Sequence, residues 1–252
     1  VEWLVPDRAL EDTAAAPRFL DDNLLDTPSI ALDAARREIV RLGGIVHQML
    51  RAAMPVATSG TRLQLGELQA LDRPIDASHR EIIGYLRKVS LHDLSTRQSN
   101  RLMGLIRIAN DLEHIGDQIA TNLVTSSRKR LDENVMISSR TAKAMANLHG
   151  RVAEALQGAV GALEREDEHA AAQVRAMKKD FGEIVEELAL HEVSRLKADE
   201  PERIMTYARE MELIEIFDDI FKTTRRIART QIAIGQATAS ENGEFTTETE
   251  LA

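Results

Sequence analysis

Apolar residues recur at helical spacing along most of this 252-residue chain. The first run follows Thr27 and Pro28, a pair typical of helix starts, and continues to Pro55. Five further runs follow, at about 62–91, 94–125, 135–165, 169–198 and 202–236. The pattern therefore predicts six helices of roughly 25–35 residues, each ~40–50 Å long at 1.5 Å per residue.

Polar segments divide this pattern. Residues 1–27 are predicted to form an extended lead-in, and residues 238–252 a disordered tail. The polar stretch around 125–134 contains the basic run Arg128-Lys129-Arg130 and is expected to be a solvated linker. The first three-helix repeat is thus placed at 28–127 and the second at 128–237. Short connections favour antiparallel neighbours, so we expect an all-α pair of elongated three-helix bundles packed side by side.

The composition supports helices and excludes several classes of site. Aromatic residues are only 3 % of the chain, and no proline occurs between Pro74 and Pro201. The absence of cysteine excludes disulfides and thiolate metal sites. A net charge of −9 argues against a nucleic-acid partner. No window of about 18 apolar residues is present to span a membrane, and no signal peptide is visible.

The candidate chemistry lies in two acid pairs. Glu113 and Asp117 recur as Glu215 and Asp219 at a constant offset of 102 residues (215 − 113 and 219 − 117). Acids four residues apart share one helix face and repel each other unless a cation lies between them. Gly116 stands within the first pair, where a mid-helix glycine costs about 1 kcal/mol relative to alanine. We therefore expect a neighbouring helix to approach closely there.

A second acid pair strengthens the case for a metal site. Asp72 and Asp76 have the same spacing on the preceding helix. Four carboxylates on adjacent helices would suit Mg²⁺, Mn²⁺ or iron better than zinc. The alternative is solvated surface, because acid pairs arise by chance among 41 acidic residues. His79 and His114 are expected to be surface residues.

The second repeat keeps only part of this set. With the same offset of 102, Asp72 and Asp76 correspond to Val174 and Lys178. Asp180 or Glu183 could substitute, and Lys178 could instead neutralise the remaining pair. We therefore predict that the first site binds metal and treat Glu215 and Asp219 as the weaker site.

Catalytic signatures are missing. A di-iron bundle enzyme needs Glu-x-x-His, but Glu113 is followed three residues later by Gly116, and Glu215 by Asp218. The sequence has no phosphate-binding loop, nucleophile elbow or triad signature. We expect a protein that is not an enzyme, with a bundle-type metalloenzyme as the disfavoured alternative.

The string Leu-Glu-His-Ile-Gly-Asp at 112–117, the Asp72/Asp76 pair and the repeated three-helix unit resemble the PhoU family over about residues 28–236. That resemblance implies tandem three-helix bundles, regulation of phosphate uptake, and multinuclear metal clusters held by duplicated acid pairs. The metal set it implies here is Asp72, Asp76, Glu113, Asp117, Glu215 and Asp219.

The lead-in narrows this resemblance. Phe19-Leu-Asp21, the run from Leu24 to Pro28, the run from Ala31 to Glu38 and His191 to Leu196 are similar to the PhoU-like C-terminal cytoplasmic domain of bacterial sodium/phosphate cotransporters. This implies a non-catalytic regulatory domain on the cytoplasmic side of the inner membrane. A transmembrane domain would then precede Val1, with Trp3 near the membrane interface. The alternative is a free-standing PhoU regulator that contacts a phosphate permease and a sensor kinase. A homodimer is a further option.

Overall fold

The computed structural model describes residues 17–195 and 202–248, and this part of the chain contains helices and no strand. The elements form six rods, which confirms the all-α prediction. The α-helices are α2 (Pro28–Ser59), α3 (Arg62–Ala70), α4 (Asp72–Val89), α5 (Thr96–Asp117), α6 (Val124–Asp132), α7 (Ser139–Arg165), α8 (Glu168–Ala176), α9 (Lys178–Arg195) and α10 (Glu202–Glu248). A 3₁₀ turn, η1, spans Asp22–Leu24, and a π-helical stretch, η2, spans Gln118–Leu123.

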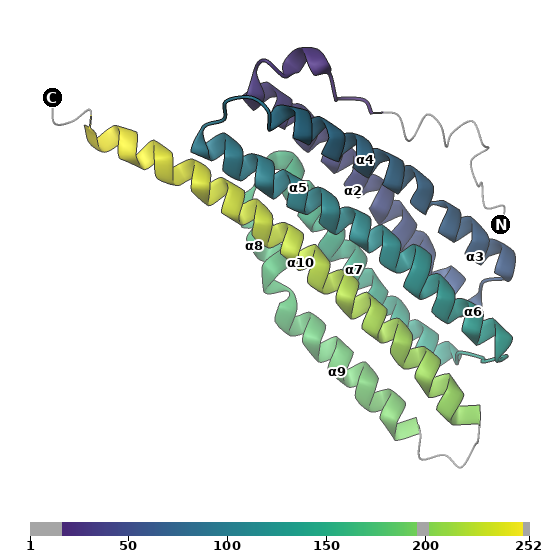
Figure 1. The fold of residues 1–252 in the computed structure, drawn as a ribbon. Helices are drawn as coiled ribbons and strands as arrows, with labels where there is room; N and C mark the ends of the chain where they lie inside the picture. The colour runs from purple at the N-terminus through teal and green to yellow at the C-terminus, as the bar shows by residue number, and fades with distance from the viewer. Residues whose placement is uncertain (1–16, 196–201, 249–252) are drawn as a thin grey trace.

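The rods form two three-helix bundles side by side (Figure 1). In the first, α2 packs against α4 and α5, while α3 and α4 form one rod that is interrupted at Leu71. In the second, α10 packs against α7, α8 and α9, and the rod of α8 and α9 is interrupted at Met177. The seam between the bundles consists of α2 against α7 and α5 against α10.

One hydrophobic core runs through both bundles and consists mainly of Ala, Leu and Ile. Aromatic side chains contribute at few places. Phe181 of α9 and Phe221 of α10 stack with ring centroids 3.7 Å apart. The core therefore has the aliphatic, helix-compatible character that the composition predicts.

Polar residues set several helix starts. Thr61 and Gln64 form a capping box at α3, and Ser95 and Gln98 form another at α5. Each box satisfies backbone N–H groups that have no partner within the first turn. Helix α2 begins at Pro28 as predicted, although the Thr27 side chain makes no capping hydrogen bond.

Helix α2 does not stop at Pro55, contrary to the sequence-based expectation, but continues to Ser59. Proline removes one backbone donor and normally breaks a helix. Here the apolar face continues through the proline, since Ala53, Met54 and Ala57 are all buried. Burial of the last turn offsets the missing hydrogen bond.

The basic run at 128–130 is not a solvated linker, and that prediction was wrong. It belongs to α6, and Arg130 is only 6 % exposed. The Arg130 guanidinium donates through Nε to the Ala57 carbonyl at 3.0 Å and through Nη2 to the Gly60 carbonyl at 3.2 Å. Hydrogen bonds to these carbonyls at the end of α2 offset the free-energy cost of removing the Arg130 guanidinium from water.

Helix α10 also extends beyond residue 237, where a disordered tail was predicted, and reaches Glu248. Once a long helix is nucleated, each added residue gains a backbone hydrogen bond, so a polar but proline-free segment can continue it. Residues 249–252 of the predicted tail lie outside the described residues, as do residues 1–16 of the lead-in.

The described end of the lead-in, residues 17–27, is held against the bundle, and we call it the strap. Its anchor is Glu38 of α2, which is fully buried. Glu38 Oε2 accepts hydrogen bonds from the backbone N–H groups of Arg18 and Phe19, both at 2.9 Å, and Oε1 accepts from Arg41 Nε. The strap also reaches α4, through Tyr85 Oη to the Asp21 carbonyl and Lys88 Nζ to Asp22.

Candidate functional site

The start of α4, with Asp72, lies against the end of α5, which carries Glu113 and Asp117. Asp72 is the first residue of α4, and Gly116 lies one residue before the end of α5. A Cβ on Gly116 would lie 3.2 Å from Asp72 Oδ1 and 3.1 Å from Ile75 Cδ1. This confirms the close approach expected at Gly116, because a larger residue would press on both side chains.

The four carboxylates share one electrostatic environment. Asp72 Oδ1 is buried and has no hydrogen-bond partner. Burial, followed by the negative charges of Asp76, Asp117 and Glu113, raises the pKa of Asp72 to about 6. Repulsion between neighbouring carboxylates disfavours the packing of α4 against α5. A cation bound between them would relieve this repulsion.

The four carboxylates meet only some of the requirements of a metal site. They supply net negative charge and one oxygen without a hydrogen-bond partner. However, within the described residues no group of three or more His, Asp or Glu side chains is arranged to hold a metal. The metal site at Asp72, Asp76, Glu113 and Asp117 stays a prediction.

The acid pair of the second repeat has different surroundings. Glu215 and Asp219 are both exposed on α10. Lys222 Nζ lies 3.0 Å from Asp219 Oδ1 and 2.9 Å from Asp218 Oδ2, and these hydrogen bonds raise the pKa of Lys222. Asp219 is therefore already neutralised by a cation of its own helix.

The helix bounds also correct how the two repeats correspond. Elements α8 and α9 repeat α3 and α4 at an offset of 106 (168 − 62, 176 − 70 and 178 − 72). Lys178 thus takes the place of Asp72, and Gly182 that of Asp76, so the expected match to Val174 and Lys178 was wrong by four residues. The third helices of the two repeats, α5 with η2 and α10, do correspond at an offset of 102. Residues at that spacing are buried in both repeats: Leu112 and Ile214, Ile115 and Phe217, and Ile119 and Phe221.

Sequence reasoning missed a backbone irregularity beside the first site. The π-helical stretch η2 begins directly after Asp117. Its first residue, Gln118, is buried, with Nε2 3.0 Å from His114 Nε2 and with Oε1 lacking a hydrogen-bond partner. Such π-helical turns are rare and frequently accompany functional sites. No residue pattern in the sequence signals this one.

An ion pair across the seam, between buried Asp111 and half-exposed Arg226, was also missed. Asp111 of α5 is 5 % exposed, and its Oδ1 lies 2.7 Å from Arg226 Nη2 of α10. Arg226 Nε donates to both carboxylate oxygens. The available signal was the position of Asp111, an acid within the apolar stripe beside Leu112.

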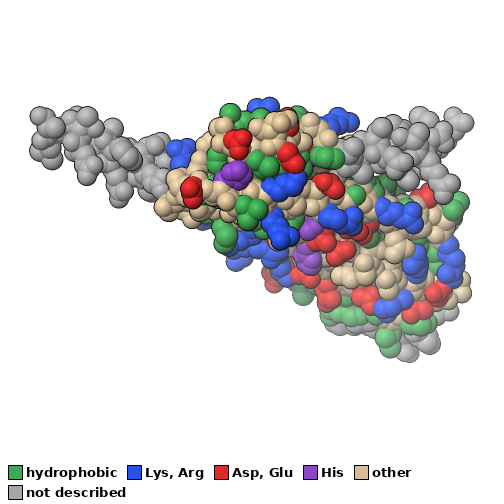
Figure 2. All heavy atoms as spheres, turned by 45° about the horizontal axis from the view of Figure 1, so that its top comes forward, with side chains coloured by type: hydrophobic (Ala, Val, Ile, Leu, Met, Phe, Trp, Pro, Cys, Tyr) green, Lys and Arg blue, Asp and Glu red, His purple; other side chains and the backbone are tan. Residues whose placement is uncertain are grey.

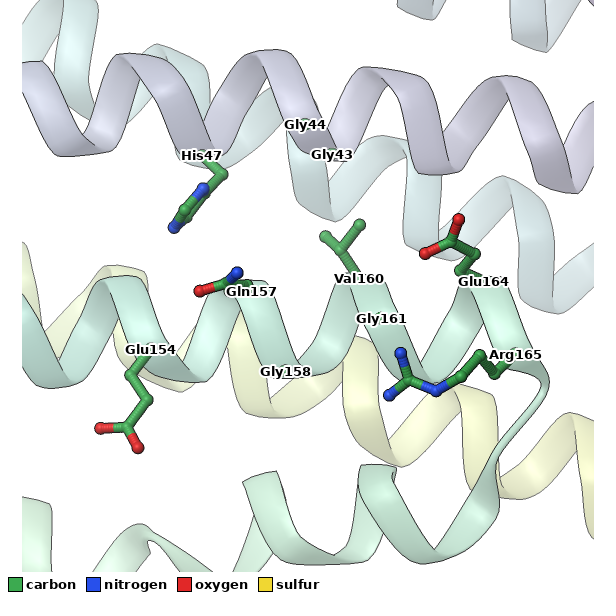
Figure 3. Close-up of a pocket in the computed structure, with 10 residues that line it drawn as sticks. All are labelled: Gly43, Gly44, His47, Glu154, Gln157, Gly158, Val160, Gly161, Glu164 and Arg165. Carbon is green, nitrogen blue, oxygen red and sulfur yellow. The ribbon is translucent and has the colours of Figure 1, made fainter.

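A groove of about 470 Å³ lies along the seam between α2 and α7 (Figure 3). Gly43 and Gly44 line it from α2, and Gly158 and Gly161 from α7. His47 points from α2 toward α7, and burial, together with Arg51, lowers its pKa. At neutral pH the groove thus contains an uncharged histidine. Elsewhere, acidic and basic side chains are intermingled over the face that Figure 2 shows.

This architecture, two three-helix bundles side by side, is the fold of solved PhoU proteins. Residues 39–124 match the family model for the PhoU domain. The chain therefore contains a PhoU domain, and the resemblance to the PhoU family is confirmed. PhoU from Pseudomonas aeruginosa has the same fold, with a TM-score of 0.75 at 18 % identity over 82 % of this chain and 98 % of that one. The phosphate transport system regulatory protein PhoU from Streptococcus pneumoniae gives 0.71 at 13 % identity, over 83 % and 97 %.

The curated relatives are longer proteins. YjbB of Salmonella typhimurium, named as an inorganic phosphate export protein, is 27 % identical over 178 residues, which are 71 % of this chain and 33 % of that protein. YjbB of Escherichia coli K12 is 32 % identical over 114 residues, 45 % of this chain and 21 % of that one. The chain thus spans about a third or less of these relatives. In the described ranges, no helix is long and apolar enough to cross a bilayer.

Proposed function

We propose that this chain is a non-catalytic regulator of inorganic phosphate transport that acts at the cytoplasmic side of the inner membrane. The observation that carries the proposal is the complete two-bundle PhoU fold, which covers 98 % of a PhoU protein. One protein of this fold is named a phosphate transport system regulator, and the curated relatives are named for phosphate export. Fold and relatives thus support the same physiological context.

Two forms of this function remain as proposals. In the first, the chain is the regulatory domain of a sodium-dependent phosphate transporter, which is supported by relatives that are longer than this chain and match it over about a third of their length. In the second, it is a free-standing PhoU regulator of a phosphate permease and sensor kinase. The near-complete coverage of both solved PhoU proteins favours the second form.

We further propose that Mg²⁺, Mn²⁺ or iron binds at Asp72, Asp76, Glu113 and Asp117. Support comes from the unpartnered Asp72 oxygen and from the three acidic neighbours that raise its pKa. A cation there would replace repulsion between α4 and α5 by attraction, and would thus fix the position of α4. The exposed pair in the second repeat, where Lys222 already contacts Asp219, is the weaker candidate.

Regulation is tested by phosphate flux. Cells that lack their own PhoU regulator and express this chain should accumulate less radiolabelled phosphate than the same cells with an empty vector. Replacing external sodium by potassium separates the two forms, because only the cotransporter form loses its effect. Unchanged accumulation despite soluble, helical protein would contradict both.

Metal binding is tested by elemental analysis of purified protein. Replacing Glu113 and Asp117 with alanine should remove most bound manganese or iron. The matched double variant Glu215→Ala with Asp219→Ala has the same spacing and charge change on α10, and should retain the metal. Equal metal content in wild type and the Glu113/Asp117 variant would refute the first site.

A further inference from the structure

A second cavity, of about 520 Å³, lies where the strap meets α2 and the end of α7. Its lining is strongly basic, although the protein as a whole has a net charge of −9. Four of its seven lining residues are arginines and only one is acidic. The lining consists of Arg18 and Phe19 of the strap, Arg36, Arg37, Val40 and Arg41 of α2, and Glu164 of α7.

The acids that pair with these arginines do not line the cavity. Asp33 Oδ1 contacts Arg36 at 2.7 Å and Oδ2 contacts Arg37 at 2.9 Å. Glu38 is occupied by Arg41 and by the backbone N–H groups of the strap. These counter-charges thus lie outside the lining, in which four arginines face one glutamate.

Two of the arginines are held rigidly. The side chain of Arg36 is 11 % exposed, and its Nη1 donates to the carbonyls of Leu163 and Glu164 at 3.1 and 2.6 Å. Arg41 is 13 % exposed, and its Nη2 donates to Ser78 Oγ at 3.1 Å. These fixed charges need no reordering when an anion enters, which lowers the cost of binding.

The other two arginines lie at the surface. The Arg37 side chain is 58 % exposed, and among the described residues it is paired through Nε with Asp33. Arg18 is exposed, and its backbone, not its guanidinium, bonds to Glu38. Guanidinium groups present a planar fork of donors that matches two oxygens of a phosphate. The cavity thus combines fixed positive charge with two accessible forks.

We propose that this cavity binds a phosphate group, with Arg18 and Arg37 donating to its oxygens and with Arg36 and Arg41 supplying fixed positive charge. The choice of phosphate over another oxyanion rests on the proposed function in phosphate transport. Glu164 is the one acidic residue in the lining. Because the strap forms one wall, an occupied cavity would link the strap to the seam between the bundles.

Calorimetric titration of the whole chain with inorganic phosphate tests the proposal. Arg18→Gln and Arg37→Gln should each weaken binding about tenfold, the loss expected for one charge-assisted hydrogen bond. Glu164→Gln should bind more tightly than wild type, because it removes the repelling charge. Arg140→Gln is the matched control: it lies at the other end of α7, about 36 Å from Glu164 at 1.5 Å per residue, and should bind as wild type does.

Vesicle sedimentation identifies the source of the phosphate group. Vesicles of equal parts phosphatidylglycerol and phosphatidylcholine are compared with phosphatidylcholine alone. Affinity for free phosphate assigns a soluble ligand, whereas affinity for the anionic vesicles that Arg18→Gln and Arg37→Gln weaken assigns a lipid headgroup. The proposal is overturned if neither binds, or if both arginine variants bind as wild type does. That result would leave the flux test of regulation unaffected, since the two readouts are independent.

Discussion

The charge on Asp72 should destabilise the metal-free protein, and its removal should therefore stabilise it. Asp72→Asn keeps the shape of the side chain but removes a charge that lies close to Asp76, Asp117 and Glu113. The pKa of Asp72 rises from 3.8 to about 6. At 1.36 kcal/mol per unit this corresponds to about 3 kcal/mol. Because the side chain is only half-buried, solvent screening reduces the expected gain to about 1 kcal/mol.

The sign of the pH dependence follows from linkage. As the pH falls below 3.8 the carboxyl becomes protonated in both the folded and the unfolded chain, so the penalty falls toward zero. As the pH rises to about 6, the unfolded chain ionises first and the penalty on the folded state grows to its full value. Asp72→Asn should thus match wild type near pH 3.5 and exceed it above pH 7.

Urea unfolding with EDTA at both pH values measures this difference, and the thermal midpoint should rise by about 2–4 °C at the higher pH. Asp93→Asn, in the loop between α4 and α5, is the control for loss of one carboxylate. Added Mn²⁺ should reverse the order, because it stabilises the form that binds it. A loss of stability in Asp72→Asn at high pH without metal would refute the reasoning.

Two further predictions concern the seam between the bundles. Gly43→Ala places a Cβ 2.6 Å from Val160 Cγ2 and should cost about 1–3 kcal/mol of unfolding free energy. Gly44→Ala meets no atom within 4 Å and should gain up to about 1 kcal/mol from helix propensity, so equal effects in urea unfolding would contradict the packing. Arg226→Gln should cost about 1–2 kcal/mol, because Asp111 loses its charge-assisted hydrogen bonds while the half-exposed position of Arg226 leaves the pair partly screened by water. Adding Asp111→Asn should restore much of this loss, and additive losses in the double-variant cycle would contradict a direct pair.

Apolar periodicity predicted the number of rods, because each helix buries one face and the Leu, Ile and Ala residues of that face recur at helical spacing. It predicted the helix ends less well. Pro55 marks a lost hydrogen bond in the sequence, but the buried Ala57 beyond it offsets that loss only once α2 is packed. A residue such as proline indicates the local free-energy cost of continuing a helix, whereas tertiary packing determines where the helix ends.

The basic run shows the same limit for charge. The sequence reports that Arg130 carries a charge, but not that its acceptors are the carbonyls of Ala57 and Gly60, which are 73 and 70 residues away. In the sequence, a solvated arginine cannot be distinguished from a buried arginine that joins two helix ends. Only the tertiary structure separates them.

For the candidate site, the sequence supplied the acidic residues and the role of Gly116. It did not supply the correspondence between the repeats, because the offset of 102 measured in the third helices was carried to the second helices. The second helices correspond at an offset of 106 and the third helices at 102, so four fewer residues separate them in the second repeat. Lys178 therefore takes the place of Asp72. Its positive charge, in addition to the exposure of Glu215 and Asp219, separates the second repeat from the first.

The anchor of the strap has a consequence for which sequences this protein tolerates. Glu38 holds main-chain N–H groups at positions 18 and 19, so the attachment does not depend on which side chains stand there. Nearly any residue can occupy these positions without loss of the anchor, and proline is the exception because it has no N–H. Variation in the strap can thus change the side chains that line the basic cavity, while buried Glu38 keeps its hydrogen bonds to the strap's main chain.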